Sequence, residues 1–334
     1  MLLLFIRCQF TIILSISILA ACQEPQTYDR RVTAANGSGG VNSNNRFGDG
    51  NDLDPNDPCG AEKAFGYAFQ GSEQTGAYIV GGRVATTTDL VTRSTVKVHL
   101  GAGHCSGTLI GPNHVVTAAH CFQDATSASQ VRLGFGENGN PDLNIAVTGF
   151  VVHPKYEGIF GTENGGYLER VFYDVAVISF EGDVSNDYYP VVVGDSSKEA
   201  KPGSSVLVAG YGAYFETDRR VRPLSLVETE VGDLLTDLRE IQLSGGEGKG
   251  ACYGDSGGPT YTLDSRRSCL KVVGTTTGPG RNSDYTCEYG SGTMMDITTY
   301  KGWMKCAFED LNYPLTYLAD DASRSDCSLN TPIF

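Results

Sequence analysis

Basic residues are scarce in this sequence. Its 334 residues include 25 Lys and Arg against 39 Asp and Glu, which gives a formal net charge of −14 at pH 7. A surface that binds nucleic acid is basic, so this balance argues against nucleic acid as the main partner. The acidic charge favours solubility and carries little information about the substrate.

Internal repeats are absent, and the length allows one large or two medium domains. The chain contains 42 glycines, which fits a loop-rich β protein better than a helical one. Apolar segments bounded by turn residues predict strands at Leu90–Leu100 and His114–Thr117, with a Gly111-Pro112 turn before the latter.

One segment has helical periodicity. Apolar residues within 299–311 recur at spacings of three and four, which places them in one stripe along a helix. The stripe consists of Tyr300, Trp303, Met304, Ala307, Phe308 and Leu311. Thr298 or Thr299 is suited to cap the helix at its start.

The sequence also lacks a loop of oxygen ligands suited to calcium, and we expect no cofactor and no metal. One pattern offers zinc ligands, because His104-Cys105 and His120-Cys121 place imidazole and thiol groups in pairs. We nevertheless expect no zinc site there.

The N-terminal segment predicts export. Residues 1–21 are nearly all apolar and end in small residues, as a secretory signal does. The sequence Leu19-Ala20-Ala21-Cys22 resembles the lipobox of bacterial lipoproteins, which implies a mature chain that begins at a lipidated Cys22. The resemblance associates an Asp directly after the cysteine with retention at the inner membrane. Because Gln23 stands there instead, we expect an outer-membrane or cell-surface location. Release from the cell, plain secretion and a retained anchor helix are the alternatives.

Two further segments precede the folded part. Residues 22–58 are rich in Asn, Gly, Ser and Asp and have almost no aliphatic residues. They bury too little apolar surface to offset ordering, so we interpret them as a flexible tether. We interpret residues 59–78 as a propeptide that is more ordered than the tether.

A glycine-rich turn carries the strongest chemical signal. Gly254-Asp255-Ser256-Gly257-Gly258-Pro259 places one hydroxyl among glycines, which allow positive φ angles and leave space for a substrate carbonyl. Backbone N–H groups in such a turn can converge on a developing oxyanion. Ser256 is therefore a candidate nucleophile.

A serine nucleophile needs a base that a third group orients. Thr117-Ala118-Ala119-His120-Cys121 offers the base, and Asp174 stands at the head of an apolar strand, where a carboxylate needs a partner. The three candidates follow one another along the chain in the order His, Asp, Ser. In this order and in these motifs, residues 79–310 resemble the trypsin/chymotrypsin family of serine endopeptidases. The resemblance implies that His120, Asp174 and Ser256 are catalytic.

The resemblance also implies an all-β, chymotrypsin-like fold. It consists of two Greek-key, six-stranded antiparallel β-barrels at 79–190 and 191–298, followed by a C-terminal helix and tail at 299–334. Residues 157–170 form a longer segment than compact members have, and we expect a surface loop there. We expect a monomer that acts on proteins or peptides.

The family begins its mature chain at a sequence similar to Ile79-Val80-Gly81-Gly82. This similarity implies a zymogen that is cut between Tyr78 and Ile79, after which the new α-ammonium of Ile79 pairs with Asp255. Since Tyr78 precedes the cut, a protease that prefers aromatic residues is the expected activator, and the chain itself is one candidate.

The resemblance assigns further roles around the nucleophile. The N–H groups of Gly254 and Ser256 form the oxyanion hole. Gly250, Thr277, Gly278 and Gly292 line the specificity pocket. Because Gly250 stands where trypsin-like members carry Asp, we expect apolar or aromatic residues before the scissile bond, and not Arg or Lys.

Eight of the ten cysteines remain once Cys8 and Cys22 are set aside, which suits four disulfides in an oxidising compartment. The family implies the pairs Cys105–Cys121 and Cys252–Cys287. Proximity in the C-terminal tail suggests Cys306–Cys327, and the two cysteines that remain give Cys59–Cys269. The competing functional hypothesis is a protease fold that serves as a binding or adhesion lipoprotein without cutting.

Overall fold

The computed structural model is described here over eleven stretches of chain, all after residue 78. They are residues 79–101, 103–142, 145–163, 166–182, 184–185, 187–212, 223–244, 248–263, 269–278, 292–315 and 317–318. The predicted signal peptide, Cys22, tether and propeptide lie outside them and stay predictions. Within these stretches, every helix falls short of the length and apolar character needed to cross a bilayer.

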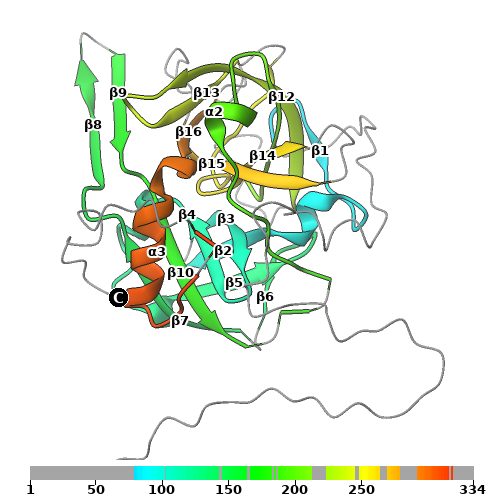
Figure 1. Ribbon diagram of the computed structural model, residues 1–334, viewed down its shortest axis with the longest axis vertical. Coiled ribbons are helices and arrows are strands. Elements are labelled where there is room, and N and C mark those ends of the chain that lie inside the picture. The colour runs from blue at the N-terminus through cyan, green and yellow to red at the C-terminus, as the bar shows by residue number, and fades with distance from the viewer. Residues whose placement is uncertain are drawn as a thin grey trace, which may run out of the picture. The chain divides into compact units, whose positions relative to one another are not determined.

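Six antiparallel strands of the second half of the chain close into a barrel (Figure 1). They are β11 (Ser205–Gly210), β12 (Ser225–Leu235), β13 (Glu240–Leu243), β14 (Pro259–Leu263), β15 (Leu270–Gly278) and β16 (Thr293–Asp296). Their order is β12-β11-β14-β15-β16-β13, and β13 pairs back to β12. The short strand β1 (Arg83–Val84) adds to the outside of β12.

The first half forms a seven-stranded antiparallel sheet in the order β6-β5-β2-β3-β4-β10-β7. The strands are β2 (Thr95–Leu100), β3 (Gly103–Gly111), β4 (His114–Thr117), β5 (Val131–Phe135), β6 (Asn140–Pro141), β7 (Ala146–Val152) and β10 (Ala176–Glu181). No pairing among the described residues joins its two edges, so it is a half-barrel. The predicted all-β architecture is confirmed, with one barrel closed and the other open.

Alternation along the strands separates the faces of each sheet. On β11, Val206 and Val208 point into the closed barrel, whereas Leu207 and Ala209 join the core that both sheets share. On β2, Val96 and Val98 belong to the core of the half-barrel, which leaves Lys97 between them on the opposite face. This opposite face of β2 and β3 meets the closed barrel.

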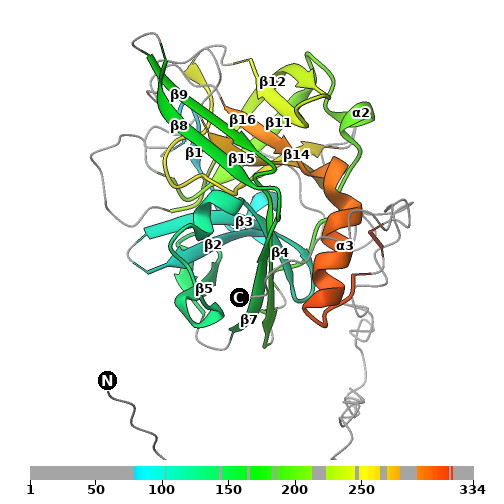
Figure 2. The ribbon, with the colours of Figure 1, turned by 90° about the vertical axis from the view of Figure 1, so that its left-hand side faces the viewer.

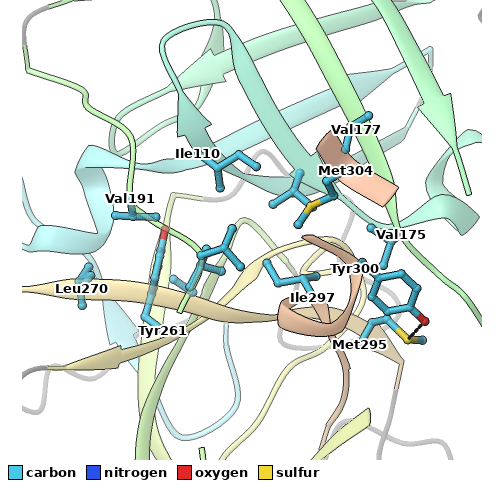
Figure 3. Packing of buried hydrophobic residues seen from close by; sticks show 14 of the residues in the cluster. Ile110, Val175, Val177, Val191, Tyr261, Leu270, Met295, Ile297, Tyr300 and Met304 are labelled. Atoms are coloured by element: carbon cyan, nitrogen blue, oxygen red, sulfur yellow. Dashed lines mark hydrogen bonds between the residues drawn. The ribbon is translucent and has the colours of Figure 1, made fainter. Parts of the chain in front are cut away.

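A common core fills the space between the two sheets and the C-terminal helix (Figure 3). Ile110 and Val177 of the half-barrel, Tyr261 and Met295 of the closed barrel and Met304 of the helix are all buried in it. The Tyr261 hydroxyl is 2.8 Å from Ser94 Oγ. Because this core is continuous, the seam between the sheets is held in one geometry.

The C-terminal helix is confirmed. A 3₁₀ turn, Ile297–Tyr300, leads into α3 (Lys301–Asp310), and the predicted apolar stripe faces the common core. The predicted cap at Thr298 or Thr299 is wrong, because the Asp296 carboxylate accepts from Thr298 N at 3.0 Å and from Thr298 Oγ1 at 2.7 Å. A carboxylate placed before the 3₁₀ turn satisfies the first N–H groups instead.

The remaining helical segments within the described stretches are single turns. They are α2 (Ser196–Glu199) and the 3₁₀ turns Leu90–Arg93, Ala119–Phe122 and Ala128–Gln130. The first 3₁₀ turn shortens the strand predicted at Leu90–Leu100, which begins only at Thr95.

The segment expected as a surface loop is a β-hairpin. β8 (Glu157–Glu163) and β9 (Gly166–Phe172) pair antiparallel over seven residue pairs and make a two-stranded sheet of their own. Figure 2 shows this two-stranded ribbon, which comes just before β10 along the chain. The extra residues therefore form regular structure immediately before Asp174.

Candidate active site

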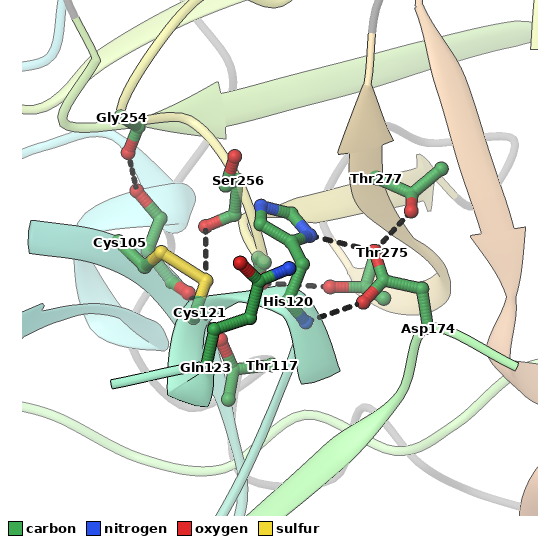
Figure 4. Close-up of a disulfide and its surroundings, with 12 residues drawn as sticks. Cys105, Thr117, His120, Cys121, Gln123, Asp174, Gly254, Ser256, Thr275 and Thr277 are labelled. Carbon is green, nitrogen blue, oxygen red and sulfur yellow. Dashed lines mark hydrogen bonds and ion pairs between the residues drawn. A yellow bond between two sulfur atoms is a disulfide. The ribbon is translucent and has the colours of Figure 1, made fainter. Parts of the chain in front are cut away.

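His120 and Asp174 meet where the half-barrel faces the closed barrel (Figure 4). His120 lies in the 3₁₀ turn that follows β4, and Asp174 lies just before β10, the neighbour of β4 in the sheet. His120 Nδ1 is 2.7 Å from Asp174 Oδ2, and His120 N is 2.7 Å from Asp174 Oδ1. Two bonds to one carboxylate fix both the ring and its backbone. The Asp174 side chain is fully buried, whereas that of His120 is 22% exposed.

Thr277 gives Asp174 a third donor. Its hydroxyl donates to Asp174 Oδ2 from the end of β15, across the seam between the two sheets. A buried carboxylate is costly unless donors surround it, so these three bonds account for its stability. The sequence placed Thr277 in the specificity pocket and gave no signal of this contact.

The backbone before Asp174 takes an unusual conformation. Tyr173 has φ of 54°, which is rare for a bulky residue. Its ring stacks on His153 with centroids 4.9 Å apart, Arg239 lies over it at 5.6 Å, and Tyr300 meets it edge-on at 6.2 Å. Burial lowers the pKa of His153 to about 3, which keeps it neutral in this aromatic stack. The stack holds the turn that aims Asp174 at His120.

The Ser256 loop lies against β3. The Ser256 carbonyl accepts from Ser106 N at 2.7 Å, and the Gly254 carbonyl accepts from Ser106 Oγ at 3.0 Å. Gly257 has φ of 78°, and a Cβ there would lie 2.1 Å from Thr117 Oγ1, so only glycine fits. With both carbonyls turned towards β3, the N–H groups of Gly254 and Ser256 donate to no described residue.

Figure 4 places Ser256 beside the imidazole, on the side that faces away from Asp174. The hydrogen bonds among the described residues include none from the Ser256 hydroxyl to His120. Such nucleophile–base contacts are commonly long before substrate binds. The structure thus brings all three predicted residues to one place, with the Asp174–His120 half already bonded.

A disulfide lies directly beside the His120 imidazole. Cys105 of β3 is bonded to Cys121, which directly follows His120, and this pair is as predicted. The two sulfurs and the imidazole lie within 4.8 Å of one another, but bonded sulfurs are not thiolates and cannot serve as thiolate ligands for zinc. Cys252, Cys269 and Cys306 are also disulfide-bonded. Their predicted partners, Cys287, Cys59 and Cys327, lie outside the described residues.

The predicted zymogen pair is buried. Ile79 is 0% exposed, and Val80 exchanges two backbone hydrogen bonds of 3.1 Å with Gly250. Asp255 is also 0% exposed and accepts from Cys252 N at 2.9 Å and Gly212 N at 2.8 Å. Burial raises the pKa of Asp255 to about 7, and these two backbone bonds lower it only in part.

Three of the four predicted pocket residues lie on or next to neighbouring strands. Thr277 and Gly278 end β15, and Gly292 directly precedes the adjacent strand β16. A Cβ on Gly292 would lie 2.6 Å from Met294 Cε and 3.1 Å from Leu243 Cδ1. The surroundings of Gly292 are therefore apolar.

Comparisons with known proteins agree with this architecture. A family model described as Trypsin matches residues 79–304. Transmembrane protease serine 11A of Homo sapiens is 27% identical over 217 residues, 60% of this chain and 48% of that protein. Transmembrane protease serine 11E of Mus musculus is 29% identical over 209 residues, 58% of this chain and 47% of that protein. This chain thus spans about half the length of these two relatives.

A relative of a different kind is also similar. The venom peptide isomerase heavy chain of Agelenopsis aperta is 23% identical over 222 residues, which cover 60% of this chain and 86% of that protein. Its match extends over most of its own length.

Proposed function

Since the chain belongs to the trypsin family, we propose that it is an exported serine endopeptidase that hydrolyses peptide bonds with Ser256, His120 and Asp174. The contact of His120 Nδ1 with Asp174 Oδ2 is the observation that carries this proposal. In this pairing the ring proton belongs on Nδ1, and Nε2 serves as the base for Ser256.

The reaction proceeds through an acyl-enzyme. His120 Nε2 takes the Ser256 proton as Oγ bonds to the scissile carbonyl carbon, and the carbonyl oxygen becomes an oxyanion. The imidazolium then gives that proton to the leaving amine as the C–N bond breaks. Water repeats the sequence on the ester and restores Ser256. Asp174 stabilises the imidazolium throughout, and its three hydrogen bonds hold it in place.

The oxyanion is bound by the N–H groups of Gly254 and Ser256. Both lack an acceptor among the described residues, and Ser106 anchors both carbonyls on the opposite side. Gly254 has φ of 91°, which favours glycine at this point. Removal of one such donor typically costs about 10²–10³ in turnover.

The specificity pocket accepts an apolar or aromatic residue. Gly250 supplies no carboxylate at the proposed base, and a buried substrate cation would be unpaired there. Met294 and Leu243 add apolar surface beside Gly292.

Digestion of a peptide library tests the function and this preference together. We expect chain cut before Ile79 to cleave after Tyr, Phe or Leu, and a fluorophosphonate to label Ser256. Cleavage after Arg or Lys would contradict the pocket assignment. Absence of both cleavage and label would favour a non-catalytic binding protein.

Activation follows from the buried Asp255. In the uncut chain, Asp255 is satisfied only by two backbone N–H groups among the described residues. A cut between Tyr78 and Ile79 creates an α-ammonium on a residue that is already buried. An opposite charge beside a buried carboxylate stabilises its ionised form. Cleavage thereby locks the loop that carries Gly254 and Ser256.

The pH dependence of stability tests this switch. In the uncut chain, native Asp255 keeps its proton between about pH 4 and about pH 7, whereas the unfolded chain releases it. The free energy of unfolding therefore falls as pH rises through this window, by about 1.4 kcal/mol for each unit of pKa difference. In the cut chain, the Ile79 ammonium stabilises ionised Asp255, so the free energy of unfolding should not fall across this window. Urea unfolding of both forms across the window measures the difference.

Two features make that comparison specific. Buried His114, whose pKa is lowered to about 4, contributes to the slope equally in both forms and cancels. In the uncut Asp255→Asn variant, the free energy of unfolding should no longer fall as pH rises through this window, although the chain has not been cut. Equal slopes for the cut and uncut chains would contradict the ion pair.

The cellular location is part of the proposal. The first relatives are named as transmembrane proteases, which supports export or membrane association of this chain. Attachment of lipid to Cys22 of a bacterial protein is the more specific prediction. The mass of the mature N-terminal peptide checks it, because a chain that begins elsewhere or carries no lipid contradicts it.

A further inference from the structure

Two unusual backbone positions meet next to Asp174. Among the described residues, the residues other than glycine with positive φ are Tyr173 at 54°, Arg239 at 57° and Asn312 at 62°. Asn tolerates this region, whereas Tyr and Arg adopt it rarely. The Arg239 guanidinium lies over the Tyr173 ring, with Cζ 5.6 Å from the ring centroid. Such backbone strain persists only where the surroundings enforce it, and it concentrates at functional sites.

Arg239 is the last residue of the turn between β12 and β13. Its N–H is 3.3 Å from the Thr236 carbonyl, and its own carbonyl accepts from Asp296 N at 2.8 Å. Glycine or asparagine usually fills a turn position with this φ, because neither is strained there. Arginine is unfavourable for the turn itself, so any benefit must come from the contacts of its side chain.

The Arg239 guanidinium contacts two aromatic rings at once. Arg239 Cζ is 5.1 Å from the Tyr300 ring centroid, and the Tyr173 and Tyr300 rings meet edge-on with centroids 6.2 Å apart. A cation within about 6 Å of a ring face is attracted by the π electrons. Among the described residues, no carboxylate forms an ion pair with Arg239. The guanidinium therefore connects the Tyr173 ring to the turn that precedes α3.

The Tyr173 backbone links this contact to Asp174. The Tyr173 carbonyl accepts from Val175 N at 2.8 Å, and the Val175 carbonyl accepts from His153 N at 2.9 Å. Asp174 is thus the central residue of a tight turn, and the φ of Tyr173 sets the direction of that turn. If Tyr173 relaxed to negative φ, the peptide before Asp174 would rotate and the carboxylate would move away from His120 Nδ1.

We propose that Arg239 is a positioning residue for catalysis, because its guanidinium stabilises the backbone turn that directs Asp174 at His120. This inference rests on the proposed function. In this role, Arg239 acts on kcat through the fraction of molecules in which Asp174 is correctly placed. The substrate pocket is the same in all of them, so KM does not depend on Arg239.

Arg239→Asn tests this role. Asparagine tolerates the backbone angle of the turn, but it removes the guanidinium. We expect kcat of the cut protein to fall about fivefold at unchanged KM, and fluorophosphonate labelling of Ser256 to slow by the same factor. Because a neighbouring carboxylate favours the protonated imidazole, the acid limb of the pH profile of kcat/KM should move to lower pH. Thermal unfolding checks that the variant is folded at the assay temperature.

A second substitution shows whether Arg239 acts through Tyr173. Glycine adopts positive φ without strain, so Tyr173→Gly removes the need for the guanidinium. Arg239→Asn should therefore lower kcat in the unaltered chain but leave it unchanged, within about twofold, in the Tyr173→Gly background. If Tyr173→Gly does not fold, Tyr173→Asn provides the same comparison, because asparagine also tolerates this angle.

Arg132→Met is the matched control. It removes the same charged group from an exposed position of β5, and it should leave kcat, KM and the labelling rate unchanged. A loss equal to that of Arg239→Asn would indicate a general effect of net charge and would contradict the role of Arg239.

Two further results overturn the inference. One is an unchanged kcat and pH profile in folded Arg239→Asn. The other is an equal loss of kcat with and without Tyr173→Gly, which would mean that Arg239 acts independently of the turn before Asp174. Failure of the proposed function is distinguishable from both, because the unaltered cut chain would then hydrolyse no peptide and take no fluorophosphonate label on Ser256.

Discussion

The Ser256→Ala variant is expected to lose about 10⁶-fold in kcat, because loss of the nucleophile removes the covalent route altogether. A residual acceleration of about 10³–10⁴ over water remains if the Gly254 and Ser256 N–H groups still bind the oxyanion. The variant should fold normally, since Ser256 is anchored through its carbonyl and its hydroxyl donates to no described residue. Steady-state kinetics on the purified, cut protein measures the loss, and thermal unfolding checks the fold.

The matched control is Ser197→Ala. Ser197 is exposed on α2 and its hydroxyl bonds only Asp195 Oδ1 among the described residues, so its removal should leave kcat and KM unchanged. Hydrolysis by Ser256→Ala at a rate comparable to the unaltered protein would remove Ser256 from the mechanism. A large loss in Ser197→Ala would instead indicate that the assay reports folding.

The sequence predicts the chemical groups of the site because each sits in a short local motif. The glycines around Ser256 are required by backbone angles that no other residue adopts readily, as the φ of Gly257 illustrates. Cys105 and Cys121 are predictable as a pair through the family resemblance. The apolar stripe of α3 is predictable because helical periodicity is a local property.

Other features depend on contacts between distant segments. The Thr277 hydroxyl reaches Asp174 across 103 positions of sequence, and no local pattern marks it. The positive φ of Tyr173 is sustained by His153, Arg239 and Tyr300, which come from three distant segments of the chain. Barrel closure also depends on long-range register: β12 pairs with β13, whereas the edges of the half-barrel stay apart in the described residues.

The hairpin before Asp174 illustrates a further limit. Residues 157–170 contain several glycines and charges, which favour a loop when only composition is considered. The strands β8 and β9 nevertheless pair along their full length around a two-residue connection. A two-stranded ribbon gains its stability from cross-strand pairs, and those become visible only once the register is known.

The Asp174→Asn variant is expected to lose about 10⁴-fold in kcat with little change in KM. The variant amide can donate to His120 Nδ1, which forces the ring proton onto Nε2 and leaves no lone pair there to accept from Ser256. The hydrogen-bond distances can therefore remain near 2.7 Å while the tautomer is wrong. Kinetics measures the loss, and a structure of the variant would show an unmoved ring.

Thr277→Val separates this tautomer effect from loss of support. It removes one donor to Asp174 but keeps the two bonds from His120, so the carboxylate still orders the ring. We expect a stability loss of about 1–3 kcal/mol from the missing buried hydrogen bond, with a much smaller fall in kcat than in Asp174→Asn. If the two variants lost kcat equally, Asp174 would act by holding the seam between the sheets together, and control of the His120 proton would not be its role.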